Sequence, residues 1–283
     1  MDGFEWRVYC LYGMHVSRNH IDSVDVSLSG RRIVIGLSSL EGNTWDGGLT
    51  VLSDDGVVLC SQYSSAGISK VRFSGPNFIL AARDDGNVVI YSADKLEEMQ
   101  SFWVHDDLVS CVAYDPHHES HFASCGWDGS IHLWDWLSKA KPVSSYIDAH
   151  QGHVNEVTYS PFDSNLFCSV GWDKYLRLWD IRENPSSGCS TIVNVGQIST
   201  CVSYESSDSG KLLVGTDAGD VLSIDPRSGP ESSILCRSRV HKRRIRRITP
   251  SPASTSLSFM TASDDTTFSI FCNTNEGIKE EQR

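Results

Sequence analysis

Two sets of residues in this sequence combine a histidine, a serine and an aspartate, which are the residue types of a hydrolase triad. In such a triad the histidine takes the proton of the serine hydroxyl, and the aspartate orients the imidazole. The first set is His105, Ser124 and Asp128, and a shift of 45 residues brings back the same types as His150, Ser169 and Asp173. An enzyme needs one triad, whereas repetition at a fixed spacing is what a structural role predicts. We therefore expect these residues to hold the fold together, and we predict that the chain has no catalytic residues.

The spacing of 45 residues belongs to a longer internal repeat. The segments HFASCGWDGSIHLWDW (121–136) and LFCSVGWDKYLRLWDI (166–181) align over their whole length. Short alternating strands recur 39 to 47 residues apart and end at a bulky apolar residue, at Leu52, Tyr91, Trp134, Trp179, Ile224 and Phe271. A period of about 40 to 45 residues, built of four short strands with Gly/Asp turns, is typical of a propeller blade. The sequence thus predicts an all-β propeller with six visible blades, one domain over residues 1–272, and a polar C-terminal tail over 273–283.

The motifs GWDG and LWD make the chain similar to the WD40 family, whose blades are locked by a hydrogen-bonded set of His, Ser or Thr, Asp and Trp. This resemblance implies that Trp134 and Trp179 complete the two sets above. The last blade offers a third set, with Phe271 in place of the tryptophan: His241, Thr261 and Asp265. Such a set pairs polar groups that would otherwise be costly to bury.

The composition bears on partners and cofactors. A net charge of −12 repels nucleic acid and anionic lipid and favours basic proteins or peptides, and the sequence has no run of 18 apolar residues. We therefore expect no direct nucleic-acid binding and no membrane span. The nine scattered cysteines contain no CxxC pair and read as small buried residues in a reducing compartment. Phosphate-binding and zinc-protease motifs are missing, and the His117–His118 pair reads as solvated, so we expect no cofactor and no metal.

The first blade departs from the repeat. Between the strands expected at 32–37 and 48–52 runs SSLEGNTWDG, a connection longer than the two to five residues usual in hairpins. This stretch, IVIGLSSLEGNTWDGGLTVL, resembles the first blade of the WD-repeat subunits of methylosomes, the complexes of type II protein arginine methyltransferase. Further similar segments are GISKVRFSGPNFILAARDDGNVVIY, VHDDLVSCVAYDP and VGTDAGDVLSID.

The methylosome resemblance implies a non-catalytic scaffold, found in cytoplasm and nucleus. It would bind the barrel domain of the methyltransferase and help to present histone tails and Arg/Gly-rich proteins. The family's contact tryptophan falls on Trp45, and the same connection supplies further candidate partner-binding residues: Ser39, Leu40, Asn43 and Asp46. The alternative for Trp45 is that its ring folds back onto its own blade.

The number of blades leaves two possibilities open, because the methylosome family has seven and this sequence shows six. Either a blade is missing, or the ring closes with six. Closure would use an N-terminal strand near Trp6–Leu11 as the outer strand of the last sheet. We favour closure, because open sheet edges are prone to unwanted pairing.

Two other segments suggest different partners. The motif LWDIR (178–182) resembles the one by which some propellers dock on a cullin-type ubiquitin ligase adaptor, so a ligase substrate receptor is the alternative function. The motif overlaps residues that the blade itself needs. The basic run at 241–247 lacks interleaved aromatic residues, so it favours a local partner contact or a solvated rim over a nucleic-acid site.

Overall fold

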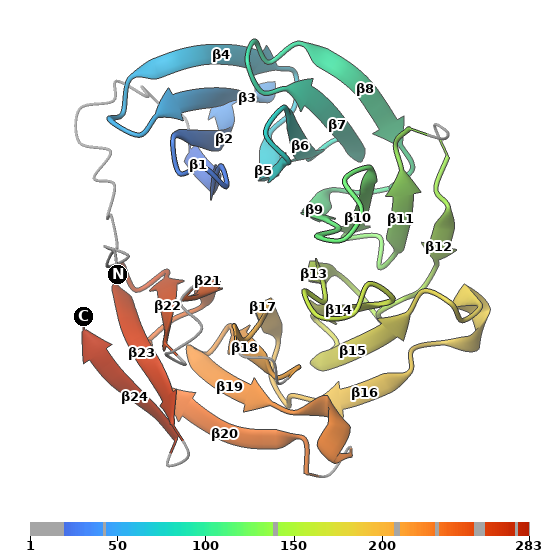
Figure 1. The fold of residues 1–283 in the computed structure, drawn as a ribbon, viewed down its shortest axis with the longest axis vertical. Helices are drawn as coiled ribbons and strands as arrows, with labels where there is room; N and C mark the ends of the chain where they lie inside the picture. The colour runs from blue at the N-terminus through green and yellow to red at the C-terminus, as the bar shows by residue number, and fades with distance from the viewer. Residues whose placement is uncertain are drawn as a thin grey trace.

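A computed structural model describes residues 20–41, 44–137, 141–206, 210–229, 232–251, 258–274 and 277–282. These residues form six antiparallel four-stranded sheets arranged around a central axis (Figure 1). In each sheet the strands follow one another in chain order, so each sheet is a propeller blade. The predicted all-β class and the six blades are confirmed.

The blades have the following strands. Blade 1 contains β1 (His20–Val26), β2 (Arg32–Glu41), β3 (Thr44–Ser53) and β4 (Val58–Ser64). Blade 2 contains β5 (Ile68–Ser74), β6 (Phe78–Arg83), β7 (Asn87–Ser92) and β8 (Glu98–Trp103). Blade 3 contains β9 (Val109–Tyr114), β10 (His121–Gly126), β11 (Ile131–Asp135) and β12 (Ser144–Tyr146).

The second half of the chain repeats this arrangement. Blade 4 contains β13 (Val154–Tyr159), β14 (Leu166–Gly171), β15 (Tyr175–Asp180) and β16 (Thr191–Asn194), with the short 3-10 helix η1 (Pro185–Ser187). Blade 5 contains β17 (Ser199–Tyr204), β18 (Leu212–Thr216), β19 (Asp220–Ile224) and β20 (Ile234–Arg239), with η2 (Pro226–Ser228). Blade 6 contains β21 (Ile245–Pro250), β22 (Ser258–Ser263), β23 (Phe268–Thr274) and β24 (Gly277–Gln282). No helix in the described part of the chain is long and apolar enough to cross a membrane.

The hydrophobic core lies between neighbouring blades. Phe102 of blade 2 contacts Phe122 and Trp134 of blade 3, with ring centroids 5.5 and 4.9 Å apart. Tyr146 of blade 3 packs in the same way against Trp179 of blade 4, at 5.0 Å. Because large aromatic side chains bury much apolar area, these contacts fix the order of the blades.

One junction differs from the others. Five clusters of buried apolar residues each join two consecutive blades, from blades 1 and 2 to blades 5 and 6. A sixth cluster comes from blade 1 alone and consists of Ile33, Ile35, Leu37 and Leu52. Among the described residues, no such cluster joins blade 6 to blade 1, although the two blades follow one another around the ring (Figure 1).

The C-terminal segment forms a strand that the sequence analysis did not predict. Residues 273–283 were expected to form a polar tail, but β23 extends to Thr274 and residues Gly277–Gln282 form β24, the outer strand of blade 6. Its one large apolar residue, Ile278, packs against the cluster between blades 5 and 6. The expected closing strand at 6–11 lies outside the described residues, and β24 occupies the outer position assigned to it.

The first-blade connection is also different from the expectation. The stretch expected as a loop continues the ladder of β2 and β3 through the pairs Ser38↔Gly47, Leu40↔Trp45 and Glu41↔Thr44. The two strands are therefore longer than the expected 32–37 and 48–52, and they form one long hairpin.

The role of β24 gives a direct test by truncation. Deleting residues 277–283 removes the outer strand of blade 6 and exposes the edge of β23. We expect the melting temperature to fall by at least about 2 °C, as for a loss of about 1 kcal/mol in a chain of this size. Thermal melting followed by circular dichroism measures this, and an unchanged melting temperature would show that the segment is a tail.

Candidate partner-binding face

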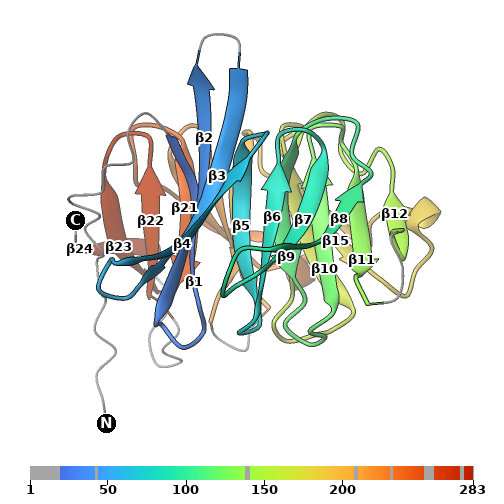
Figure 2. The same ribbon diagram turned by 90° about the horizontal axis from the view of Figure 1, so that it is seen from above.

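The hairpin of β2 and β3 rises beyond the other strands at one face of the ring (Figure 2). Near its end Leu40 and Trp45 are cross-strand partners, and their exposed fractions are 64% and 50%. Cross-strand partners point to the same side of a sheet, so the two side chains form one apolar pair. Ser39 and Asp46 are paired one step closer to the ring and point to the other side. Asn43 lies outside the described residues.

Trp45 is held in place at its polar end. Its indole N–H donates a 2.6 Å hydrogen bond to Oδ2 of Asp84, in the turn between β6 and β7 of the neighbouring blade. Burial, together with the charges of Asp22 and Asp85, raises the pKa of Asp84, although the bond from Trp45 opposes this rise. The contact therefore crosses from blade 1 to blade 2, and half of the indole still faces solvent.

A glycine makes this contact sterically possible. A Cβ atom added to Gly67 would lie 2.0 Å from Oδ2 of Asp84 and 2.7 Å from Nε1 of Trp45. Both distances are far below van der Waals contact, so a larger residue at position 67 would push the indole and the carboxylate apart. The backbone of the next blade thus fixes the orientation of the hairpin tip.

The hairpin borders a recess of about 670 Å³ at the mouth of the central axis. Trp45 and Trp127 are the aromatic residues of its lining. The charged residues around it are of both signs: Asp22, Lys70, Asp84, Glu156, Arg244 and Arg246. A recess with aromatic and charged walls can accept a polypeptide segment.

A second aromatic group on this face was not foreseen as functional. The ring of His153 lies between those of Trp127 and Trp172, with centroid distances of 4.5 and 4.4 Å. The two tryptophans are 40% and 43% exposed. The repeat alignment contained a signal for these tryptophans. Trp127 and Trp172 occupy the same turn position in two blades, although the structural set needs only the aspartate that follows each of them.

The His-centred sets are assembled inside the blades. His105 lies 2.9 Å from Asp128 through Nδ1 and 2.8 Å from the Ser124 hydroxyl through Nε2. Trp134 donates its indole N–H to the same hydroxyl at 3.0 Å. Burial alone would raise the pKa of Asp128, but the hydrogen bond and the charge of His105 hold it well below its usual range.

The second and third sets repeat this geometry. In blade 4, His150 lies 2.9 Å from Asp173 and 2.7 Å from the Ser169 hydroxyl, and Trp179 donates to that hydroxyl at 2.9 Å. In blade 6, the corresponding partners of His241 are Asp265 at 3.1 Å and Thr261 at 2.7 Å, with Phe271 buried beside the histidine ring.

The hydroxyl groups of these sets are inaccessible to a substrate. Ser124 and Ser169 are 0% exposed and Thr261 is 1% exposed. Each accepts or shares hydrogen bonds with the histidine of its set, so its polar atoms are satisfied inside the blade. A buried serine with no path to solvent cannot attack a substrate, and the geometry supports structure, not hydrolysis.

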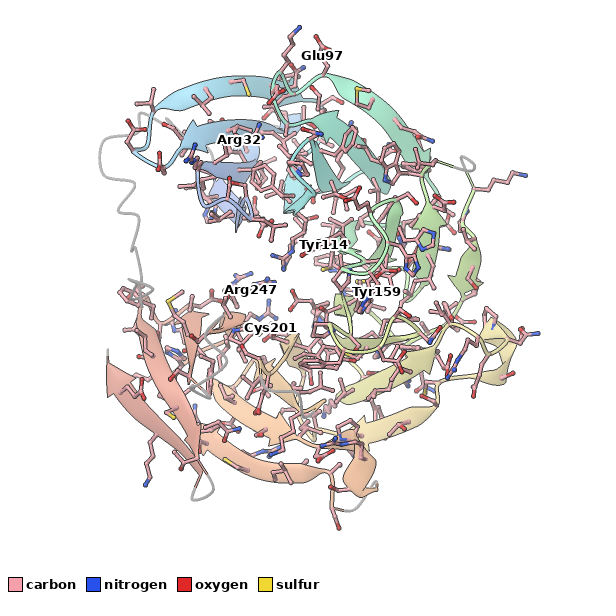
Figure 3. The ribbon with its side chains drawn as sticks, viewed as in Figure 1. Arg32, Glu97, Tyr114, Tyr159, Cys201 and Arg247 are labelled. Carbon is pink, nitrogen blue, oxygen red and sulfur yellow. The ribbon has the colours of Figure 1, made fainter. Side chains whose placement is uncertain are left out.

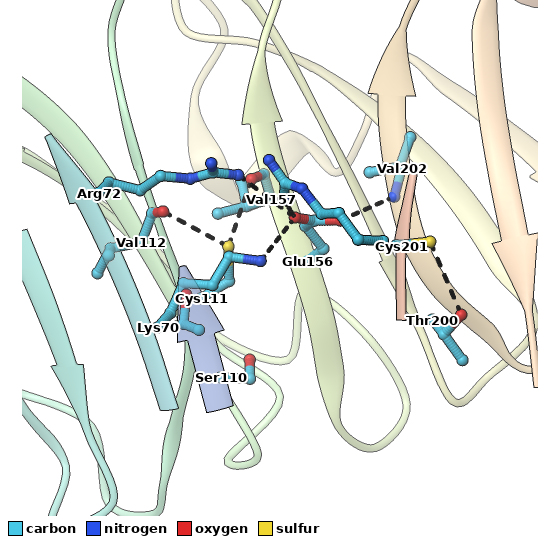
Figure 4. A network of polar contacts seen from close by, with 12 residues as sticks. Lys70, Arg72, Ser110, Cys111, Val112, Glu156, Val157, Thr200, Cys201 and Val202 are labelled. Atoms are coloured by element: carbon cyan, nitrogen blue, oxygen red, sulfur yellow. Dashed lines mark hydrogen bonds and ion pairs between the residues drawn. The ribbon is translucent and has the colours of Figure 1, made fainter. Parts of the chain in front are cut away.

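Beneath the recess, one buried carboxylate joins four blades (Figure 4). Glu156 of β13 contacts Lys70 of β5 at 3.0 Å and Arg247 of β21 at 2.6 Å through Oε1. Its Oε2 accepts from the backbone N–H of Val202 in β17 at 2.9 Å, and Arg72 lies 3.9 Å away. Burial alone would raise the pKa of Glu156, but Lys70, Arg247 and Arg72 lower it to about 2.

The two segments that suggested other partners are occupied by contacts within the chain. In LWDIR, Trp179 is buried between blades 3 and 4, and Arg182 pairs with Asp180 at 2.5 Å. In the basic run, Arg247 points toward the centre of the ring (Figure 3) and Arg246 pairs with Asp264 at 2.6 Å. Trp179 and Arg247 thus have roles inside the fold, whereas the side chains of Arg182 and Arg246 are 65% and 63% exposed.

Comparison with known proteins agrees with this geometry. The model of the family described as "WD domain, G-beta repeat" matches residues 96–135 and 140–180. A chain from the "Crystal Structure of Mitotic Checkpoint Complex" superposes with a TM-score of 0.76 at 17% identity, over 92% of this chain and 76% of that chain. The chain thus contains WD40 repeats at these positions and has a β-propeller fold.

One relative with a similar sequence is a methylosome protein. Methylosome protein WDR77 of Xenopus laevis is 27% identical over 133 residues, which is 44% of this chain. The matched stretch spans 39% of the length of that relative. The chain therefore resembles a methylosome propeller over part of its length.

The structural role of the His-centred sets can be tested at Asp173. Asp173→Ala leaves the ring of His150 and the guanidinium of Arg177 without their acceptor. We expect the free energy of unfolding to fall by about 1–3 kcal/mol. Urea unfolding gives this value, with Asp54→Ala, at an exposed turn, as the matched control. A loss of partner binding at unchanged stability would contradict the structural role.

Proposed function

We propose that this chain is a non-catalytic scaffold subunit of a protein arginine methyltransferase complex of the methylosome type. The observation that carries the proposal is the Leu40–Trp45 pair on the long hairpin of blade 1. Exposed tryptophans on fixed elements are favoured as interface anchors, because they bury a large apolar area with little loss of conformational entropy. The partial match to a methylosome protein supports the choice of partner.

The side chain of Trp45 is preorganised for binding. The bond from Trp45 to Asp84 and the close approach of Gly67 hold the indole in one orientation. An anchor that is already ordered loses less entropy on binding, which raises affinity without additional contacts. In this proposal the type II methyltransferase covers the exposed half of the indole and the neighbouring Leu40.

The chain also helps to present substrates in this proposal. Its net charge of −12 attracts basic polypeptides such as histone tails and Arg/Gly-rich proteins. In this proposal methyl transfer itself belongs to the partner. We further propose that the complex occurs in both the cytoplasm and the nucleus.

The proposal predicts a specific effect of the Trp45→Ala substitution. The dissociation constant for the type II methyltransferase should rise about thirtyfold or more, which corresponds to roughly 2 kcal/mol of binding free energy. The melting temperature of the free propeller should change little, because half of the side chain is already exposed. Isothermal titration calorimetry and thermal melting measure the two quantities.

The matched control is Trp103→Ala, which removes a tryptophan that is 76% exposed on the outer strand of blade 2. This variant should bind with unchanged affinity. Unchanged affinity of Trp45→Ala together with a lowered melting temperature would show that Trp45 stabilises the propeller and does not anchor the partner.

A further inference from the structure

The face opposite the hairpin carries a cluster of one carboxylate and two imidazoles. In an antiparallel blade, successive connections lie at alternate ends, so the β9–β10 connection lies at the end opposite the β2–β3 hairpin. This connection contains Asp115 and His118, and His121 begins β10, which gives the spacing D-x-x-H-x-x-H. One ligand atom from each of the three residues lies within 4.8 Å of the others.

The distances in this cluster suit a small divalent metal ion. Oδ2 of Asp115 lies 3.0 Å from Nδ1 of His118 and 3.8 Å from Nδ1 of His121. A zinc ion bonded to nitrogen and oxygen at 2.0–2.2 Å in tetrahedral geometry places its ligand atoms about 3.3 Å apart. The observed distances lie on either side of this value, so small side-chain rotations bring the three atoms into coordination.

The backbone of the connection holds the carboxylate in position. The N–H of His117 donates to Oδ1 of Asp115 at 2.8 Å, which leaves Oδ2 facing the two imidazoles. The backbone N–H of Asp115 donates to the carbonyl of His121 at 2.9 Å, and the N–H of His121 donates to that of His118 at 3.0 Å. These backbone hydrogen bonds hold the three residues close together without using the side-chain nitrogens of the two histidines.

The carboxylate of Asp115 is buried beneath the two imidazoles. Its side chain is 2% exposed, and in the part of the chain that the structure describes its ion-pair partners are His118 and His121. Nδ1 of His118 lies in hydrogen-bond contact with Oδ2 of Asp115 at 3.0 Å, and a metal ion bound between the three residues would replace this contact.

A second His/Asp cluster in the described part of the chain differs in how accessible its histidines are. In the group of His105, Asp128 and His132, the ring of His132 already contacts the hydroxyls of Ser130 and Ser145 at 3.0 and 2.9 Å. Both nitrogens of His105 are likewise engaged within its structural set. By contrast, His118 and His121 have side chains that are 51% and 38% exposed, so an ion can reach them from solvent.

We propose that Asp115, His118 and His121 form a binding site for a divalent transition metal of the zinc class. The set is one carboxylate and two imidazoles, which suits Zn²⁺ and Co²⁺ and is unsuited to Ca²⁺ or Mg²⁺ because those ions prefer oxygen ligands. The exposed side of the two rings leaves a coordination position for water. The site is independent of the hairpin and of any methyltransferase.

The test uses the full chain, treated with a chelator and then dialysed free of it. Titration with Zn²⁺ at pH 7.5, followed by calorimetry, should show one equivalent bound with a dissociation constant of about 10 μM or lower. Titration with Co²⁺ should give a visible absorption band at the same stoichiometry. Zn²⁺ should also raise the melting temperature, because it binds the folded state.

Three variants decide the outcome. His118→Ala and His121→Ala should each weaken Zn²⁺ binding at least tenfold, and thermal melting will verify that they are folded. His20→Ala removes an exposed histidine elsewhere and should bind like the unmodified chain. Absence of a one-equivalent site in the unmodified chain, or its retention in both His118→Ala and His121→Ala, would overturn the proposal and leave the cluster as a hydrogen-bonded imidazole–carboxylate pair.

Discussion

The buried carboxylate of Glu156 is the interaction on which the arrangement of the blades most depends. It reaches Lys70, Arg247 and the backbone N–H of Val202, and so connects the innermost strands of blades 2, 4, 5 and 6. Among the described residues, apolar clusters join each blade to the next from blade 1 to blade 6, but no such cluster joins blade 6 to blade 1. Arg247 of blade 6 is linked across the axis to Lys70 of blade 2 through Glu156. A buried ion pair of this kind is strongly directional, and removal of one member leaves the other charges uncompensated.

The fixed blades in turn position the face that we assign to partner binding. In blades 3, 4 and 6 the polar groups of the His-centred sets bond to one another inside the blade. The long hairpin of blade 1, which we assign to partner binding, departs from the repeat. Its Trp45 depends on Asp84 and Gly67 of the next blade for its orientation. The exposed tryptophans in the turns of blades 3 and 4 instead share one position of the repeat.

The features that the sequence predicted are those with local and repeated signals. The histidine of each set lies a nearly constant distance before its hydroxyl and its aspartate, so alignment of the repeats was enough to find all three sets. Trp45 was found because its segment interrupts the repeat. The sequence analysis did not predict that β2 and β3 continue as paired strands through this segment, because it took the long connection to be a loop. The strand β24 was missed because Ile278 is its one large apolar residue.

Other features have no local signal. Glu156 looks like any charged residue of a strand, and its partners Lys70 and Arg247 are 86 and 91 residues away in the sequence. Only the closure of the propeller brings them together. The cluster of Asp115, His118 and His121 was hidden for a different reason. Attention fell on the adjacent pair His117–His118, whereas the ligand atoms converge at a spacing of three residues in a tight connection.

The most direct test of this account is the pH dependence of stability in Glu156→Gln. The pKa of Glu156 is lowered from 4.5 to about 2 in the folded chain, so its contribution is fully present above pH 4.5 and is lost as the pH falls toward 2. Urea unfolding at pH 7 should show Glu156→Gln less stable by about 3–5 kcal/mol, because Lys70 and Arg247 lose their carboxylate partner while Arg72 keeps Asp25. This difference should shrink as the pH falls from 5 toward 2, and the exposed control Glu98→Gln should not show it. Equal stability of Glu156→Gln and the unmodified chain at pH 7, with parallel pH dependence, would contradict the central role of this carboxylate.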